Sequence, residues 1–338
     1  MFARAVDSDE TIKNSLKNVI FWNNNCEVGE GIDVAKKYNV RGYPTFIMTN
    51  GDGEVSSAWI GYPGPEKWAD NVYAGDKDRR TLAEKKTAFE KHSTKELACS
   101  LANSAAANYD FAGSVKYFRS ARELNPAGAQ EYTSEILTNM YYGARSGAFT
   151  LDDMTAEADI VMAAKSSTAE DKLTVATLVR GMASQMGDLD AAIPYITAGL
   201  KASEGVEELA ETRISLEIDY ALLVEKDKSK ALKLKRKSMT EGWEEDPNAL
   251  NNFAWWCYEN NFNLEEAKKL ALHGVDIAAE DGQKSNILDT AAEICNAMDD
   301  CKEAVELMRL AVELSPDRDY YQTQLAKFEK VLQEKSDG

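Results

Sequence analysis

The chain has 338 residues, with 39 lysines and arginines against 57 aspartates and glutamates, and a formal net charge of −18 at pH 7. This length exceeds the roughly 250 residues at which a single hydrophobic core stops growing, so two or more domains are expected. The acidic balance argues against binding to nucleic-acid phosphates or to anionic membranes, because both need clustered cations. We therefore expect no nucleic acid and no membrane among its partners.

The first predicted elements are a helix, a strand and a second helix. A helix is expected to open within Asp7–Thr11, with Asp7 or Ser8 as its N-cap. The apolar run Val19-Ile20-Phe21-Trp22 predicts a buried strand that ends at three asparagines. A short amphipathic helix is predicted over Gly31–Tyr38.

A β-hairpin is predicted next. Tyr43-Pro44 precedes an apolar, β-branched stretch, Thr45–Met48, and this position makes it a candidate for a cis peptide bond. Asn50-Gly51-Asp52-Gly53 has the composition of a tight turn, and Val55–Ile60 predicts the second strand. A helix over Glu66–Tyr73 follows, with Trp68 and Val72 expected to face inward.

This order of elements resembles the C-terminal half of a thioredoxin fold. The resemblance covers roughly residues 1–75; an unrelated βα element with a proline turn is the alternative. The residues that carry it run from Asp33-Val34-Ala35-Lys36-Lys37-Tyr38-Asn39-Val40 through Arg41-Gly42-Tyr43-Pro44-Thr45 to Gly61-Tyr62-Pro63-Gly64.

The resemblance implies a site for an extended protein substrate at the proline turn. In that family the residues around the cis-proline offer backbone hydrogen bonds to a substrate strand, a role that transfers to Tyr43, Pro44 and Thr45. The sequence contains no Cys-x-x-Cys pair, and the dithiol and first strands would lie upstream of Met1. We expect a truncated N-terminus, with a natural remnant as the alternative. A sheet without its central strand would expose apolar edges. No catalytic residue is assigned.

Beyond a charged boundary at Gly75–Arg80, the sequence predicts helices to the end. Small and apolar residues recur at a period near 34 residues, and this pattern resembles tetratricopeptide (TPR) repeats of four to six helix pairs. A generic α-solenoid is the alternative. The last two units are the clearest: one contains Leu250, Ala254, Ala267 and Gly274, and the next contains Leu288, Ala292, Ala304, Ala311 and Pro316.

The predicted fold class is therefore α/β plus all-α. A thioredoxin-like domain without its first strands and dithiol is expected over residues 1–75, a linker and first helix over 76–92, and a TPR-like helical domain over 93–338.

Cysteine and histidine usage predicts no metal and no cofactor. The five cysteines and two histidines have no zinc-site spacing. Cys295 and Cys301 are expected either to pair across a turn or to pack as two buried thiols, the second being favoured. No stretch approaches the ~20 apolar residues of a membrane span. As written the chain is predicted to be cytoplasmic; an export signal upstream of Met1 would make it periplasmic or exported.

The densest aromatic cluster contains Trp255 and Trp256. Adjacent helix residues point about 100° apart, so one ring is expected to pack inward, and the other is a candidate contact for a partner protein.

Two functions are compatible with these patterns. The first is a thioredoxin-like and TPR protein of the protein thiol–disulfide oxidoreductase type, which would act in cell redox homeostasis on protein or peptide substrates and hold protein partners on its repeats. Because this chain lacks the dithiol, it is predicted to be inactive in insulin reduction. The second is a non-catalytic adaptor that binds protein partners.

Overall fold

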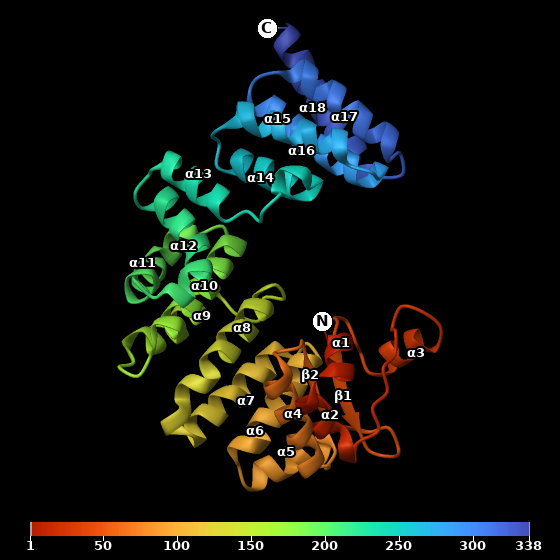
Figure 1. The fold of residues 1–338 in the computed structure, drawn as a ribbon, viewed down its shortest axis with the longest axis vertical. Helices are drawn as coiled ribbons and strands as arrows, with labels where there is room; N and C mark the ends of the chain where they lie inside the picture. The colour runs from red at the N-terminus through yellow and green to blue at the C-terminus, as the bar shows by residue number, and fades with distance from the viewer. Residues whose placement is uncertain (1, 338) are drawn as a thin grey trace. The chain divides into compact units, whose positions relative to one another are not determined.

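The computed structural model describes residues 2–337 and consists, over that range, of helices and one two-stranded sheet (Figure 1). The chain divides into two compact units, Met1–Glu225 (unit 1) and Lys226–Gly338 (unit 2). Unit 1 contains α1 (Phe2–Ser8), α2 (Glu10–Ser15), α3 (Glu30–Lys37), β1 (Thr45–Thr49), β2 (Val55–Ile60), α4 (Pro65–Lys77), α5 (Leu82–Lys91), α6 (Lys95–Ala107), α7 (Phe111–Leu124), α8 (Thr133–Ala144), α9 (Leu151–Ala163), α10 (Ala169–Met186), α11 (Ile193–Ala202) and α12 (Ala210–Leu223). Unit 2 contains α13 (Lys228–Lys237), α14 (Pro247–Glu259), α15 (Leu264–Ile277), α16 (Asp281–Ala297), α17 (Cys301–Leu314) and α18 (Asp319–Asp337).

The predicted hairpin is confirmed. Strands β1 and β2 pair antiparallel, with Phe46 opposite Trp59. The turn forms because the Asn50 side-chain oxygen accepts hydrogen bonds from the backbone N–H groups of Asp52 (3.0 Å) and Glu54 (2.9 Å). The Tyr43–Pro44 peptide bond is cis. The hairpin therefore follows the local turn chemistry of its sequence.

The predicted strand Val19–Trp22 is wrong. These residues form no regular element, and the Ile20 side chain is 99% exposed, Phe21 38% and Trp22 65%. A buried strand needs a neighbouring strand to pair with, and the sheet of the described chain contains only β1 and β2. The predicted N-cap also differs, because Asp9 caps α2 by accepting from the N–H groups of Thr11 and Ile12.

The hairpin packs on helices of unit 1 through two faces. On one face Trp59 joins a small core with Ile12, Trp68 and Val72. On the other, β2 lies against α6, and the Ala58 N–H donates to Ser104 Oγ at 3.1 Å. The hairpin is thus held by α2 and α4 on one face and by α6 on the other.

A buried lysine fastens α5 to this sheet. Lys85, 1% exposed, donates from Nζ to the Ser56 carbonyl (2.6 Å), to Ser57 Oγ (3.0 Å) and to Ser100 Oγ (3.1 Å). Burial lowers the pKa of Lys85, because the charged ammonium is desolvated. The two compact units divide between α12 and α13, and within unit 1 these contacts tie the hairpin to α5 and α6.

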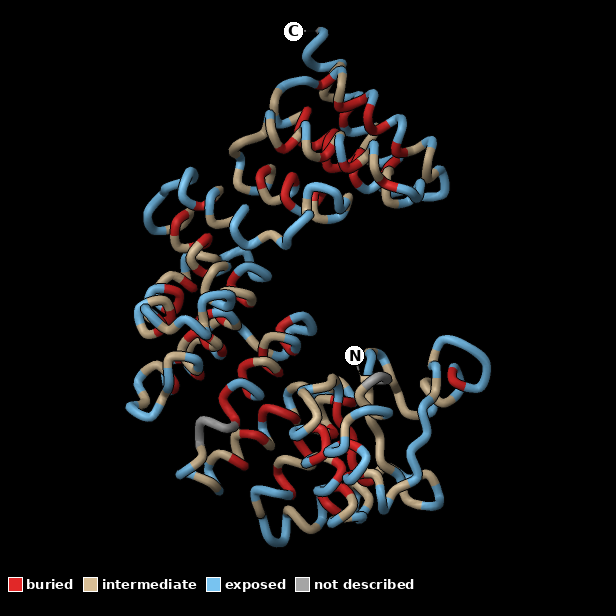
Figure 2. Tube along the Cα trace, in the orientation of Figure 1, coloured by how far each residue is buried: buried red, intermediate tan, exposed pale blue. Residues whose placement is uncertain are grey.

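Short turns join most of the remaining helices into adjacent pairs, as the repeat pattern predicts. Helices α6 and α7, α10 and α11, α14 and α15, and α16 and α17 are packed pairs of this kind. Figure 2 shows the buried residues gathered where helices face one another. Small residues permit the close approach: a side-chain carbon on Gly199 of α11 would lie 2.9 Å from Ala176 Cβ of α10. Among the helices described, none is both long and apolar enough to span a lipid bilayer.

Candidate functional site

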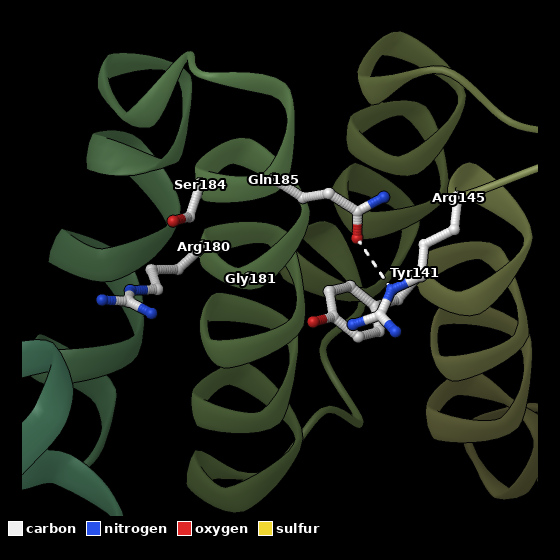
Figure 3. Close-up of a pocket in the computed structure, with 6 residues that line it drawn as sticks. All are labelled: Tyr141, Arg145, Arg180, Gly181, Ser184 and Gln185. Atoms are coloured by element: carbon white, nitrogen blue, oxygen red, sulfur yellow. Dashed lines mark hydrogen bonds between the residues drawn. The ribbon is translucent and has the colours of Figure 1, made fainter. Parts of the chain in front are cut away.

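An open pocket of about 470 Å³ lies between α8 and α10 in unit 1 (Figure 3). The two helices pack side by side, and the pocket runs across the face of α10. The lining is dominated by hydrogen-bond donors: it comprises Tyr141, Arg145, Arg180, Gly181, Ser184 and Gln185.

Helix α8 supplies Tyr141 and Arg145. Residues four apart lie on the same helix face, so the Arg145 guanidinium sits 5.8 Å from the centre of the Tyr141 ring. Arg145 is the C-cap residue of α8 and is exposed. Its Nε–H also donates to Gln185 Oε1 at 3.4 Å (Figure 3). The guanidinium is thus positioned at the pocket while most of its donors remain available.

Helix α10 supplies the other side. A capping box starts the helix, with Thr168 and Asp171 each accepting from the other's backbone N–H. Gly187 ends it in the left-handed conformation (φ +75). Gly181 lets the Tyr141 ring approach, because a side-chain carbon there would lie 3.1 Å from Tyr141 Cε2. A close contact between α8 and α10 therefore lies among the residues that line the pocket.

A buried carboxylate fixes the second arginine. Arg180 Nε and Nη2 donate to the two oxygens of Asp219 on α12, at 2.6 and 3.2 Å. The Asp219 side chain is 10% exposed and that of Arg180 is 40% exposed. This bidentate geometry holds the guanidinium rigidly while leaving part of it facing solvent. In Figure 3, Arg180 and Ser184 lie on the side of α10 away from α8.

The donor set suits an anionic group. Two guanidinium groups, two hydroxyls and one carboxamide line the pocket, and no carboxylate is among its lining residues. Arginine recognises carboxylates through paired N–H donors, and a charge-assisted hydrogen bond contributes about 1.5–3 kcal/mol. A carboxylate of an extended peptide, from a side chain or a C-terminus, matches this chemistry. The pocket is not suited to an apolar ligand.

The site residues predicted from the proline turn lie in a different part of unit 1. The Tyr43 side chain is 60% exposed, Pro44 is exposed, and Thr45 Oγ1 donates to the Gly42 carbonyl at 2.7 Å. Cys26, in the loop before α3, is half-buried, and all five cysteines are free thiols. Cys295 and Cys301 are thus two buried thiols, the favoured alternative, and burial raises the pKa of Cys295 to about 11.

The predicted tryptophan pair divides as its spacing indicates. Trp256 packs inward, with its ring 6.1 Å from Phe253 and 5.2 Å from Phe262. Trp255 is 36% exposed, and its ring centre lies 4.9 Å from that of Tyr258. Trp255 is therefore the ring that faces outward, on α14 of unit 2.

The residues of the α8–α10 pocket were not identified from the sequence. They belong to no local sequence motif. The signal that would have identified them is the sequence separation between residues that meet on neighbouring helices. Arg180 and Asp219 are 39 residues apart, and the Arg145–Gln185 contact spans 40 residues. Polar residues that recur at this spacing occupy matching positions of successive helix pairs.

Comparisons with known proteins give no family. No protein-family model matches the chain, and a search of curated proteins finds no match. Among solved structures, BtubC (BKLC) from P. vanneervenii is 14% identical with a TM-score of 0.36, over 70% of this chain and 92% of that one. The TPR domain of P58(IPK) is 14% identical with a TM-score of 0.27, over 82% and 71%. Scores this low identify neither a shared fold nor a shared function.

Proposed function

We propose that the chain is a non-catalytic protein-interaction scaffold whose α8–α10 pocket binds a carboxylate group of a partner protein. The observation that carries the proposal is the donor-rich lining of this pocket, with Arg145 and Gln185 on the side of α10 that faces α8 and Arg180 and Ser184 on its other side. Stacked helix pairs, which the sequence relates to TPR repeats, present such faces to extended segments. The arginines of this pocket supply specificity for negative charge.

Arg145 is the residue to substitute, because its exposed side chain is expected to contribute little to the stability of the fold. Its side chain is exposed and contacts Gln185, through a 3.4 Å hydrogen bond, and the Tyr141 ring. Arg180 is less suitable, since its loss would leave the buried carboxylate of Asp219 without its cation.

The test is fluorescence anisotropy with a labelled, glutamate-rich peptide that ends in a free carboxylate. Arg145→Ala is expected to weaken binding about tenfold or more, equivalent to about 1.4 kcal/mol per factor of ten. A peptide with glutamine for glutamate and an amidated end is expected to bind weakly. Lys201→Ala, which removes an exposed charge on α11 outside the pocket, is the matched control. Equal binding of the neutral peptide, or unchanged binding by Arg145→Ala, would refute the proposal.

We also propose Tyr43, Pro44 and Thr45 as a second contact for an extended segment. The support is the exposed Tyr43 side chain and the fact that β1 pairs with β2 alone among the described strands. Thioredoxin-type exchange at this turn is not expected, because the 338-residue sequence contains no Cys-x-x-Cys. Turnover of insulin disulfides by the intact chain would favour the oxidoreductase over the scaffold.

A further inference from the structure

Two buried oxygen atoms in unit 2 accept no hydrogen bond. They are Oδ1 of Asn251 on α14 and Oδ1 of Asp289 on α16, and within residues 2–337 neither has a partner. The two residues are 9% and 8% exposed. A buried acceptor without a donor costs about 1–3 kcal/mol, more if charged, so two at neighbouring positions need an explanation.

The two oxygens lie on one stretch of a helix pair. Helices α14 and α16 pack against each other and are bridged twice, by Gln283 Nε2 donating to Asn248 Oδ1 (3.0 Å) and Tyr258 Oη donating to Glu293 Oε2 (3.0 Å). Both bridges join residues 35 apart, so the helices run in the same direction and in register. Asn251 and Asp289 fall between the bridges, about 4–5 Å apart along the axis at 1.5 Å per residue.

The nearby cations already have partners. Lys327 donates to Glu293 Oε1 at 2.8 Å and to Gln324 Oε1 at 3.3 Å. Arg318 donates to the Tyr321 hydroxyl at 2.9 Å. The Asp289 carboxylate receives one long bond at its other oxygen, from Tyr320 Oη at 3.3 Å. It therefore lacks a cation in direct contact.

Aromatic rings border the same face. Trp255 lies one turn after Asn251, is 36% exposed and stands 4.9 Å from the Tyr258 ring. Tyr320, at the start of α18, is 52% exposed. Aromatic faces attract planar cations, most strongly at tryptophan. The two buried acceptor oxygens and the exposed aromatic rings beside them together form a site for a cation that carries several N–H donors.

We propose that this face of unit 2, formed by Asn251, Trp255, Asp289 and Tyr320, binds an arginine side chain of a partner protein. The guanidinium donates to Oδ1 of Asp289 and to Oδ1 of Asn251 and stacks against Trp255. Arginine fits better than lysine, because its planar fork reaches two separate acceptors while lying flat on a ring. Since both oxygens are covered in the unbound chain, Tyr320, whose hydroxyl donates to Asp289 at 3.3 Å and accepts from Gln324 at 3.0 Å, turns aside on binding.

Protonation of Asp289 is expected to make the affinity of this site for arginine depend on pH. Burial, the largest cause, raises the pKa of Asp289 to about 6, and Glu293 on the same helix adds to it, whereas the Tyr320 hydrogen bond, Lys327 and Arg318 lower it. The facing tyrosines remain protonated donors, since the pKa of Tyr258 is raised to about 12 and that of Tyr320 is also raised. Bound guanidinium favours the ionised carboxylate, so affinity is expected to fall as the pH drops below about 6.

The site is independent of the pocket in unit 1 and takes the opposite charge. Its test is calorimetric titration of the full chain with a short capped peptide that contains one arginine among glycines and serines. The comparison peptides carry citrulline, which is neutral and nearly isosteric, or lysine. The arginine peptide is expected to bind at least tenfold more tightly than either, and more tightly at pH 7.5 than at pH 5.

Two aspartate variants separate the site from general attraction to an acidic chain. Asp289→Asn is expected to weaken arginine-peptide binding at least tenfold and to raise the melting temperature at pH 7.5, because it removes a buried charge without changing the shape. Asp276→Asn, at an exposed position on α15, is expected to change neither. Equal binding of the citrulline or lysine peptide, equal losses in both variants, or no loss in Asp289→Asn would overturn the proposal. Arg145→Ala is expected to leave it unaffected.

Discussion

Replacing Glu157 with alanine is expected to lower the free energy of unfolding of unit 1 by about 2–4 kcal/mol. The Glu157 side chain, on α9, is 2% exposed and accepts from two arginines of α7. Arg119 Nη2 lies 3.0 Å from Oε2, and Arg122 Nη1 contacts Oε1. The carboxylate therefore holds α7 and α9 together through two charge-assisted contacts.

The size of the loss in stability follows from the groups that remain when the Glu157 carboxylate is removed. Removing Glu157 leaves two like charges side by side and a cavity between the helices. The arginine side chains are 42% and 19% exposed, so they recover some hydration, which keeps the loss below that of a fully buried pair. Urea denaturation followed by circular dichroism measures it. Glu123→Ala, at an exposed position on α7, is the control, and an equal loss there would refute the role of the clamp.

Replacing Trp68 with alanine is expected to cost about 3–5 kcal/mol. Trp68 is 2% exposed on α4, and its ring centre lies 5.0 Å from Phe2, 5.5 Å from Phe46 and 6.2 Å from Trp59. It fills the small core beneath the hairpin, and its removal leaves a cavity bordered by Phe2, Phe46 and Trp59. The hairpin is expected to lose most of its protection from amide exchange.

A milder substitution distinguishes packing from hydrogen bonding at this position. Trp68 Nε1 is buried and has no acceptor among the described residues, so Trp68→Phe is expected to cost less than about 1.5 kcal/mol. Trp22→Ala, at a side chain 65% exposed, is expected to change stability by less than about 0.5 kcal/mol. A Trp68→Phe loss as large as that of Trp68→Ala would show that this core does not depend on side-chain volume.

The elements predicted correctly from the sequence are those whose formation depends on residues close together in the chain. The turn residues Asn50 to Gly53 specify the hairpin, and the amphipathic pattern with Trp68 and Val72 specifies α4. The run Val19–Trp22 has the same composition as a strand, but strand formation depends on a partner elsewhere in the sheet. Composition alone carries no information about that partner, so the prediction failed there.

The candidate binding sites could be predicted from the sequence only in part, because most of their residues are far apart in the chain. Trp255 could be singled out because an aromatic pair on a helix must divide between inside and outside. Arg145 and Arg180, or Asn251 and Asp289, belong to helices about 35–40 residues apart and come together only through the stacking of pairs. Single side chains with ordinary surroundings in sequence give no local signal, so the packed structure was needed to identify them.

Hydrogen–deuterium exchange of the intact chain, with and without the glutamate-rich peptide, tests the central claim most directly. Binding at the pocket predicts slower exchange in the C-terminal turns of α8 (Thr133–Ala144) and α10 (Ala169–Met186) and no change in that region for Arg145→Ala. Slower exchange confined to other helices, or the same protection in the Arg145→Ala variant, would contradict a carboxylate-binding scaffold.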